Sequence, residues 1–344
     1  MKAAIINEHG SLNNIQVDEV PTPKISSSEV LIETKYGGLN HLDLFVIPGW
    51  PGLRLPMPHI LGSDGSGIIK EVGDDVTRFQ AGDRVLVNPG VGCGLCDLCL
   101  SGKQNLCRKF SILGENTSGT FAEYFKIPSQ NVLKIPDDYP LDLAAAAPLN
   151  FLTAWRMLVT QGNIQQGEYV LIQGASGGVA TAAIQIAKYF QTKVIVTTST
   201  QAKIEKAKEL GADIVINYHE TPNYSKYIFK DITRKHGVDL VIDSVGQATF
   251  NTSLKLLKTG GRLVTCGSTT GPKVDLDLRP IFWKQLQIYG STMSNHHEFS
   301  SVMKLVLNGT FTPIIDTIFP IDEIQAAEKY LSEGKHFGKV LVQF

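Results

Sequence analysis

The sequence predicts an α/β protein with two domains, one rich in β-structure and one built on a doubly wound parallel sheet. Three observations predict this. The chain has 344 residues, of which 43% are hydrophobic, enough for two cores. Its first third alternates β-branched segments with Gly and Pro turns. Its middle alternates strand and helix patterns, which is typical of a parallel sheet with right-handed crossovers.

The first domain is predicted from short strands that are bounded by turn residues. A helix is predicted to follow it. The strand segments are "EVLIETKYGG", "GSGIIKEVG" and "GDRVLVNPG", and the Ala-rich apolar stretch "LDLAAAAPLNFLTAWRMLV" predicts the helix.

The second domain is predicted from buried strands that alternate with amphipathic helices, and the tail returns to mixed structure. The expected order is "EYVLIQG" strand, "GVATAAIQIAKYF" helix, "KVIVTTS" strand, "TQAKIEKAKELG" helix ending at Gly211, and "VDLVIDSVG" strand. From about Gly290 we expect helices in "EFSSVMKLVLNG" and "IDEIQAAEKYLSEG" and a last strand in "GKVLVQF". The predicted boundaries are 1–150 for the first domain, 151–288 for the nucleotide domain, and 289–344 for a segment that returns to complete the first.

Composition argues against several classes of partner. The 32 basic and 33 acidic residues give a formal charge of -1 with no long like-charge run, so nothing indicates a nucleic-acid or membrane surface. The N-terminus "MKAAIINEHGSLNN" lacks the features of a signal peptide, and no apolar run is long enough to span a bilayer. We therefore expect a cytoplasmic protein with a small-molecule partner.

Four of the five cysteines lie in one short stretch, "GVGCGLCDLCLSGKQNLC". In a reducing compartment such spacing favours a metal site over disulfides. Four thiolates would close the coordination sphere of a tetrahedral zinc, so the site would be structural and would order the lobe 90–107. An iron–sulfur cluster and a redox dithiol are the alternatives. The expected ligands are Cys93, Cys96, Cys99 and Cys107, whereas Cys266 is expected to be a core thiol.

A glycine-rich segment, "GASGGVA", lies between a predicted strand and a predicted helix. Small residues let the backbone approach a pyrophosphate, and the helix N-terminus offers free N–H groups to the phosphates. A merely tight turn is the alternative. The residues expected to bind the dinucleotide are Gly174, Ala175, Ser176, Gly177, Gly178, Val179, Thr198, Ser199 and Lys203, with Thr153 in the preceding helix.

The end of the second strand of this domain bears on the choice of nicotinamide cofactor. NAD sites typically place Asp or Glu here to bind the ribose hydroxyls. This strand instead ends with Thr198, Ser199 and Thr200, followed by Lys203. Hydroxyls and a lysine can bind a 2′-phosphate, so NADP is favoured and NAD is the alternative, because Lys203 could equally be a solvated helix residue.

Several ordered motifs together resemble the medium-chain dehydrogenase/reductase superfamily, which contains zinc alcohol dehydrogenases and zinc-free quinone reductases. The matching segments are "GSDGSGIIKEVG", "AGDRV", the four-cysteine lobe, "GTFAEY", the glycine loop and "FGKVLV". The resemblance covers nearly the whole chain. It implies a GroES-like catalytic domain, a Rossmann domain, a cleft between them, and a homodimer or homotetramer.

The alcohol dehydrogenases of this superfamily hold a catalytic zinc, and the resemblance places its three ligands at Asn40, Ser63 and about Leu149. None of these can replace the usual Cys or His ligands. The usual catalytic zinc is therefore predicted to be absent, and a substitute site formed by His41, His59 and Asp64 is the alternative.

Without zinc the site needs a substrate that delocalises negative charge, as quinones and enones do. Asn40 and His41 could stabilise the resulting anion and His41 or solvent could protonate it, while Asn40 with Asp43 resembles the pattern of zinc-free quinone reductases. Each of the three has a structural alternative: Asn40 as a cap, His41 as a satisfied histidine, Asp43 as a loop residue. The leading hypothesis is an NAD(P)H-dependent reductase of quinones, enones or related carbonyls. The alternatives are an atypical alcohol dehydrogenase and a nucleotide-binding protein without turnover.

Overall fold

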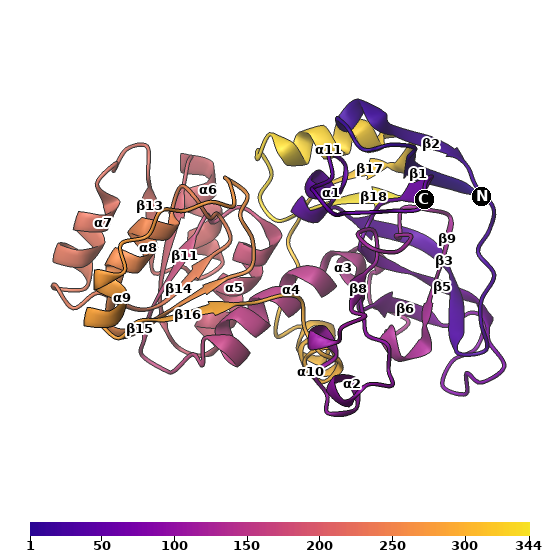
Figure 1. The fold of residues 1–344 in the computed structure, drawn as a ribbon, viewed down its shortest axis with the longest axis horizontal. Helices are drawn as coiled ribbons and strands as arrows, with labels where there is room; N and C mark the ends of the chain where they lie inside the picture. Colours follow the sequence, from indigo (N-terminus) through magenta and orange to yellow (C-terminus); the bar gives the residue numbers. More distant parts are fainter. The chain divides into compact units, whose positions relative to one another are not determined.

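A computed structural model describes all residues from 1 to 344, and the chain forms two compact units (Figure 1). Unit 1 combines Met1–Leu149 with Ser294–Phe344, and unit 2 consists of Asn150–Met293. No helix in the chain has both the length and the hydropathy that crossing a membrane requires.

Unit 1 contains three sheets. The largest runs in the order β10-β6-β5-β3-β18-β17 with β9 also paired to β3, a second runs β2-β1-β4, and a third pairs β7 with β8. These strands are β1 (Lys2–Ile6), β2 (Ile15–Glu19), β3 (Glu29–Gly38), β4 (His59–Ile60), β5 (Asp64–Val72), β6 (Arg84–Val87), β7 (Gly90–Val91), β8 (Ser111–Ile112), β9 (Tyr124–Pro128), β10 (Val132–Lys134), β17 (Ile315–Pro320) and β18 (Lys339–Gln343).

Short helices connect the strands of unit 1, and two longer ones come from the C-terminal segment. They are η1 (Leu12–Asn14), α1 (His41–Val46), α2 (Asp97–Leu100), η2 (Gln104–Leu106), η3 (Ser129–Asn131), α3 (Leu141–Ala146), α10 (His296–Leu307), η6 (Ile321–Glu323) and α11 (Ile324–Ser332).

The core of unit 1 joins residues from both ends of the sequence. Ile6, Leu39 and Phe121 pack in one buried cluster with Ile324 and Val340. Close strand pairing also explains a glycine of the "GSGIIKEVG" segment, because a Cβ at Gly67 would lie 2.0 Å from the Glu33 carbonyl oxygen on β3. The C-terminal segment is thus an integral part of this unit.

Unit 2 is a six-stranded sheet in the order β13-β12-β11-β14-β15-β16, with every pair parallel. Helix α5 buries Ala180, Ala183, Ile184 and Ala187, the spacing of one helix face, and it contacts β11 and β12 (Figure 1). The elements are β11 (Tyr169–Gln173), α5 (Gly178–Tyr189), β12 (Lys193–Thr198), α6 (Gln201–Glu209), β13 (Ile214–Asn217), α7 (Tyr224–Tyr227), η5 (Ile228–Ile232), β14 (Val238–Asp243), α8 (Phe250–Leu256), β15 (Leu257–Thr265), α9 (Arg279–Trp283) and β16 (Gln287–Gly290).

The Ala-rich stretch differs from the single helix that its sequence predicts. It forms α3, then α4 (Pro148–Trp155), and then the π-helical segment η4 (Arg156–Gln161). Pro148 has no N–H to continue the hydrogen bonds of α3, whereas a proline is well tolerated in the first turn of a new helix. The helix predicted to stop at Gly211 does stop there, because α6 ends at Glu209 and Gly211 has a φ of +100°.

Candidate functional site

The four cysteines of the lobe converge on one point. Their sulfur atoms all lie within 4.8 Å of one another, with Cys93 Sγ 3.9 Å from Cys99 Sγ and Cys96 Sγ 3.7 Å from Cys107 Sγ. Ligands at about 2.3 Å from a tetrahedral zinc lie about 3.8 Å apart. The sulfur geometry therefore fits one zinc ion with no position left for a substrate.

Backbone amides favour the thiolate form of Cys93 and Cys107, whereas burial raises the pKa of the Cys99 thiol to about 12. Lys109 N–H donates to Cys107 Sγ at 3.3 Å, and the amides of Leu95 and Cys96 lower the pKa of the Cys93 thiol to about 6. The thiolate is the form of cysteine that binds a metal ion. The lobe thus supplies the geometry of a metal centre, and its backbone amides favour the metal-binding form of two of the four cysteines.

The glycine loop directly follows β11 and opens α5. Gly174 has a φ of +80°, and Gly177 and Gly178 are the N-cap and first residue of α5. A Cβ at Gly177 would meet no atom within 4 Å, whereas a Cβ at Gly178 would lie 2.2 Å from the Asn150 amide nitrogen. The loop therefore leaves open space beside Gly177 and free helix N–H groups, which fits a pyrophosphate.

The carboxyl end of β12 carries hydroxyl groups and no carboxylate. Thr198 is the last residue of the strand, Ser199 follows it, and Thr200 caps α6 by accepting a hydrogen bond from Lys203 N–H. Lys203 is only 8% exposed, so it is not the ordinary solvated helix residue of the alternative interpretation. Thr153 is a buried residue of α4.

A buried ionic network surrounds Asn40 in unit 1. Lys339 Nζ donates to Asn40 Oδ1 at 2.5 Å and to Asp64 Oδ2 at 2.7 Å. The Asn40 amide donates to the Gly38 carbonyl at 3.0 Å and to Asp64 Oδ2 at 3.1 Å. The other Asp64 oxygen accepts from Leu149 N–H at 2.8 Å. Both amide hydrogens of Asn40 thus already have acceptors within the protein.

The two other candidate catalytic residues lie on α1. Asp43 is fully buried, caps this helix by accepting from Asn40 N–H at 2.7 Å, and has a pKa that burial raises to about 7. His41 is the first residue of α1 and is partly exposed. Burial, and secondarily the charge of Lys339, lower the pKa of His41, so its ring is neutral at neutral pH.

Comparisons with known proteins cover the chain from end to end. The alcohol dehydrogenase GroES-like domain matches residues 26–137, and the zinc-binding dehydrogenase domain matches residues 178–308. The acryloyl-coenzyme A reductase of Sulfurisphaera tokodaii is 32% identical over 345 residues, covering 100% of both chains. The chain belongs to the medium-chain dehydrogenase/reductase superfamily.

Two further relatives agree with this assignment. An alcohol dehydrogenase of Geobacillus stearothermophilus is 32% identical over 100% of this chain and 99% of its own. The crystal structure of an NAD-dependent alcohol dehydrogenase matches with a TM-score of 0.96 and 38% identity over 100% of both chains. The protein is therefore an NAD(P)-dependent oxidoreductase of the medium-chain dehydrogenase/reductase type, with GroES-like and Rossmann folds.

The positions at which the resemblance to zinc alcohol dehydrogenases places the catalytic ligands have partners within the protein. Asn40 is engaged by Lys339 and Asp64, and Ser63 Oγ donates to the Leu113 carbonyl at 2.7 Å. His59 Nε2 lies 3.0 Å from the Gly114 carbonyl oxygen. His41, His59 and Asp64 are not among the side chains that converge as a metal-ligating group.

Two buried charged residues of this candidate site escape the sequence-based prediction. Lys339 opens the apolar strand β18, and Glu328 lies on the apolar face of α11, four residues after Ile324 and three before Leu331. Lysine in a buried strand segment and glutamate at a core position of an amphipathic helix are the signals that could have identified them. Both residues are at least 98% buried.

Glu328 makes the stability of this unit depend on pH. Both of its carboxylate oxygens are buried without a hydrogen-bond partner, and burial, with the nearby charge of Asp43, raises its pKa well above the ordinary value. Groups with a raised pKa keep their proton longer in the folded state, so stability falls as pH rises through the folded pKa. For Asp43 this fall runs from about pH 4 to about pH 7, and Glu328 adds to it.

Replacing Glu328 with glutamine is therefore expected to flatten this fall in stability. The variant cannot ionise at position 328, so the contribution of this buried carboxyl group to the fall is lost. Urea unfolding midpoints measured from pH 5 to 9 test the prediction, with Glu323→Gln, an exposed residue beside α11, as the control. A slope equal to that of the parent chain would contradict it.

Proposed function

We propose that this enzyme uses NADPH to reduce a carbonyl compound with a conjugated double bond, such as an enone, an enoyl thioester or a quinone, without a catalytic zinc. One observation carries the proposal: the usual zinc-ligand positions hold Asn40, Ser63 and Leu149, and the two polar side chains are already hydrogen-bonded inside the protein. A zinc held by the four-cysteine lobe would be structural.

The charge balance around Asn40 supports this class of substrate. The Lys339 ammonium is matched by the Asp64 carboxylate, and burial raises the pKa of Glu328 well above its ordinary value, which favours its neutral form. Such a neutral network offers little stabilisation to the localised charge of an alkoxide. An enolate or hydroquinone anion spreads its charge over several atoms, so a single donor such as the neutral His41 ring is sufficient, with solvent as the final proton source.

The reduced nicotinamide cofactor would supply the hydride. The residues of unit 2 would bind this dinucleotide. The open backbone at Gly177 and the N–H groups that begin α5 suit the pyrophosphate. One of the relatives is named for a reduction of acryloyl-coenzyme A, which contains a conjugated thioester. We extend that substrate class to this chain, and an atypical alcohol dehydrogenase remains the second candidate because other relatives have that name.

A paired substrate panel tests the proposed activity. NADPH oxidation is measured with cyclohexenone, benzoquinone and acryloyl-coenzyme A, and cyclohexanone is the unconjugated match for the first. We expect turnover of conjugated substrates and at least about 100-fold lower turnover of cyclohexanone. Oxidation of cyclohexanol that requires a second zinc per chain would overturn the proposal in favour of an alcohol dehydrogenase.

A substitution just after β12 tests the proposed preference for NADPH over NADH. Replacing Ser199 with aspartate is expected to weaken NADPH binding at least about tenfold and to strengthen NADH binding, because a carboxylate repels the 2′-phosphate and accepts from the ribose hydroxyls. Dissociation constants for both cofactors provide the measurement. Gln201→Asp, at the exposed first residue of α6, is the control. Tighter binding of NADH than NADPH by the parent chain would refute this assignment.

We also propose that two copies pair through the edge of the unit 2 sheet. Strand β16 is at the end of the strand order, and Ile288 on it is 39% exposed. The neighbouring helix α9 exposes Phe282 and Trp283, at 65% and 82%. An uncovered apolar edge strand is a template for pairing with a second chain. Sedimentation measures the oligomeric state of the parent chain and of the Trp283→Glu variant. We expect a dimer for the parent chain and a monomer for the variant, because the substitution places a charge on the apolar edge.

A further inference from the structure

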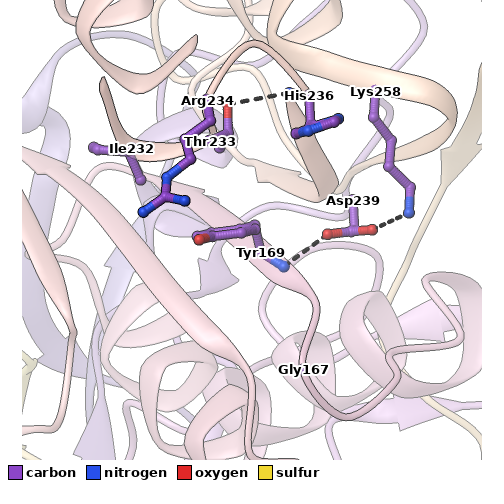
Figure 2. A pocket seen from close by; sticks show the side chains of 9 residues that line it. Gly167, Tyr169, Ile232, Thr233, Arg234, His236, Asp239 and Lys258 are labelled. Atoms are coloured by element: carbon purple, nitrogen blue, oxygen red, sulfur yellow. Dashed lines mark hydrogen bonds and ion pairs between the residues drawn. The ribbon is translucent and has the colours of Figure 1, made fainter. Parts of the chain in front are cut away.

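A hollow lies at the amino ends of β11 and β14 in unit 2, and Figure 2 shows the side chains that line it. Its volume is about 470 Å³, within the range of small-ligand sites. Tyr169, the first residue of β11, contributes an aromatic ring, and Asp239, the second residue of β14, lies beside it. The residues between η5 and β14 form the other wall.

This hollow is separate from the dinucleotide loop. The glycine loop follows Gln173 at the carboxyl end of β11, whereas Tyr169 is four residues earlier at the amino end. At about 3.3 Å per residue the two ends of the strand are about 13 Å apart. The hollow is thus separate from the expected position of the pyrophosphate.

The charges that line the hollow leave a positive excess. Asp239 accepts from Tyr169 N–H at 2.8 Å and forms an ion pair with Lys258, so these two charges compensate each other (Figure 2). Arg234 and His236 also line the hollow, and neither side chain has a hydrogen-bond or ion-pair partner in the protein. The Arg234 guanidinium is therefore free to bind an anion.

The backbone that presents Arg234 is held in an uncommon conformation. Arg234 and Lys235 have φ values of +49° and +69°, which residues other than glycine adopt at a cost. Hydrogen bonds fix this turn: Lys235 N–H donates to the Phe229 carbonyl, and His236 N–H and Gly237 N–H donate to the backbone carbonyl and side-chain oxygens of Thr233. Arg234 thus extends from an ordered turn.

We propose that this hollow binds a small molecule that combines a planar ring with a phosphate or carboxylate group. A guanidinium matches either oxyanion with two parallel hydrogen bonds, and the His236 ring supplies a further donor. The Tyr169 ring and the partly buried Ile232 offer apolar surface to the planar part of the ligand. Because the hollow is not at the glycine loop, its ligand would be an effector and not the cofactor.

Calorimetric titration of the full-length enzyme with phenyl phosphate tests the proposal. Saturating NADPH is present throughout, so that phenyl phosphate cannot bind where the phosphates of the cofactor bind. We expect saturable binding below about 10 mM, weakened at least about tenfold in Arg234→Gln. Lys235→Gln is the matched control, because Lys235 is the adjacent exposed cation, also has a positive φ, and does not line the hollow. Its affinity should stay within about twofold of the parent value.

Two further titrations identify which chemical groups of the ligand the hollow binds. Benzoate in place of phenyl phosphate distinguishes a carboxylate site from a phosphate site, and inorganic phosphate measures the part of the affinity that needs no ring. Absence of saturable binding by both aromatic probes, or equal affinities in Arg234→Gln and Lys235→Gln, would overturn the proposal. Inorganic phosphate binding as tightly as phenyl phosphate would overturn the role assigned to Tyr169.

Discussion

Replacing Cys96 with serine is expected to remove the zinc of the lobe and to lower the free energy of unfolding by several kcal/mol. Cys96 Sγ lies 3.7 Å from Cys107 Sγ, and the four sulfur atoms match the spacing around one tetrahedral ion. Serine is a poor zinc ligand and would leave three thiolates close together without full charge compensation. Elemental analysis and urea unfolding of the purified protein provide the two measurements.

The fifth cysteine provides the control for this experiment. Cys266 lies just after β15 in unit 2, outside the cluster, and it is partly exposed, so it is not the core thiol that the sequence predicts. Desolvation raises the pKa of its thiol to about 12. Cys266→Ser should therefore keep about one zinc per chain. Unchanged zinc content in Cys96→Ser would contradict the assignment of the lobe. About two zinc ions per parent chain would instead indicate a second metal site and favour an alcohol dehydrogenase.

Replacing Lys339 with methionine is the second change with a large expected effect. The buried ammonium of Lys339 lies between Asn40 Oδ1 and Asp64 Oδ2, so its removal leaves a buried carboxylate without its counter-ion. Breaking one side of a buried ion pair costs about 3–5 kcal/mol. The free energy of unfolding should fall by that amount, and turnover should fall as well, because Lys339 positions the Asn40 side chain.

Two further variants distinguish the stability lost with the buried ion pair from the stability lost with the packing of the Lys339 side chain. Adding Asp64→Asn to Lys339→Met removes the orphaned charge, so the double variant should recover part of the lost stability. Lys2→Met breaks an exposed Lys–Asp pair, with Asp322 at 3.0 Å, and should cost at most about 1 kcal/mol. Equal losses in Lys2→Met and Lys339→Met would contradict the role given to the buried network.

The sequence by itself determined the family, the parallel sheet, the glycine loop and the four-cysteine cluster. These features depend on local signals: the period of apolar residues, the spacing of ligand side chains, and small residues between a strand and a helix. Such signals act over a few residues, so the chain displays them before it folds. The break of the Ala-rich helix at Pro148 is also a local effect, and the identity of that residue could have predicted it.

Only the tertiary structure decided how the candidate active-site residues are engaged. Asn40 is separated from Lys339 by 299 positions, and no local pattern indicates that the lysine occupies the amide oxygen that a substrate or metal would otherwise approach. The same holds for Glu328, whose pKa depends on burial and on the charge of Asp43. Hydrogen bonds and electrostatic interactions between buried groups act through space at a few ångströms, so their partners are set by packing and not by sequence distance.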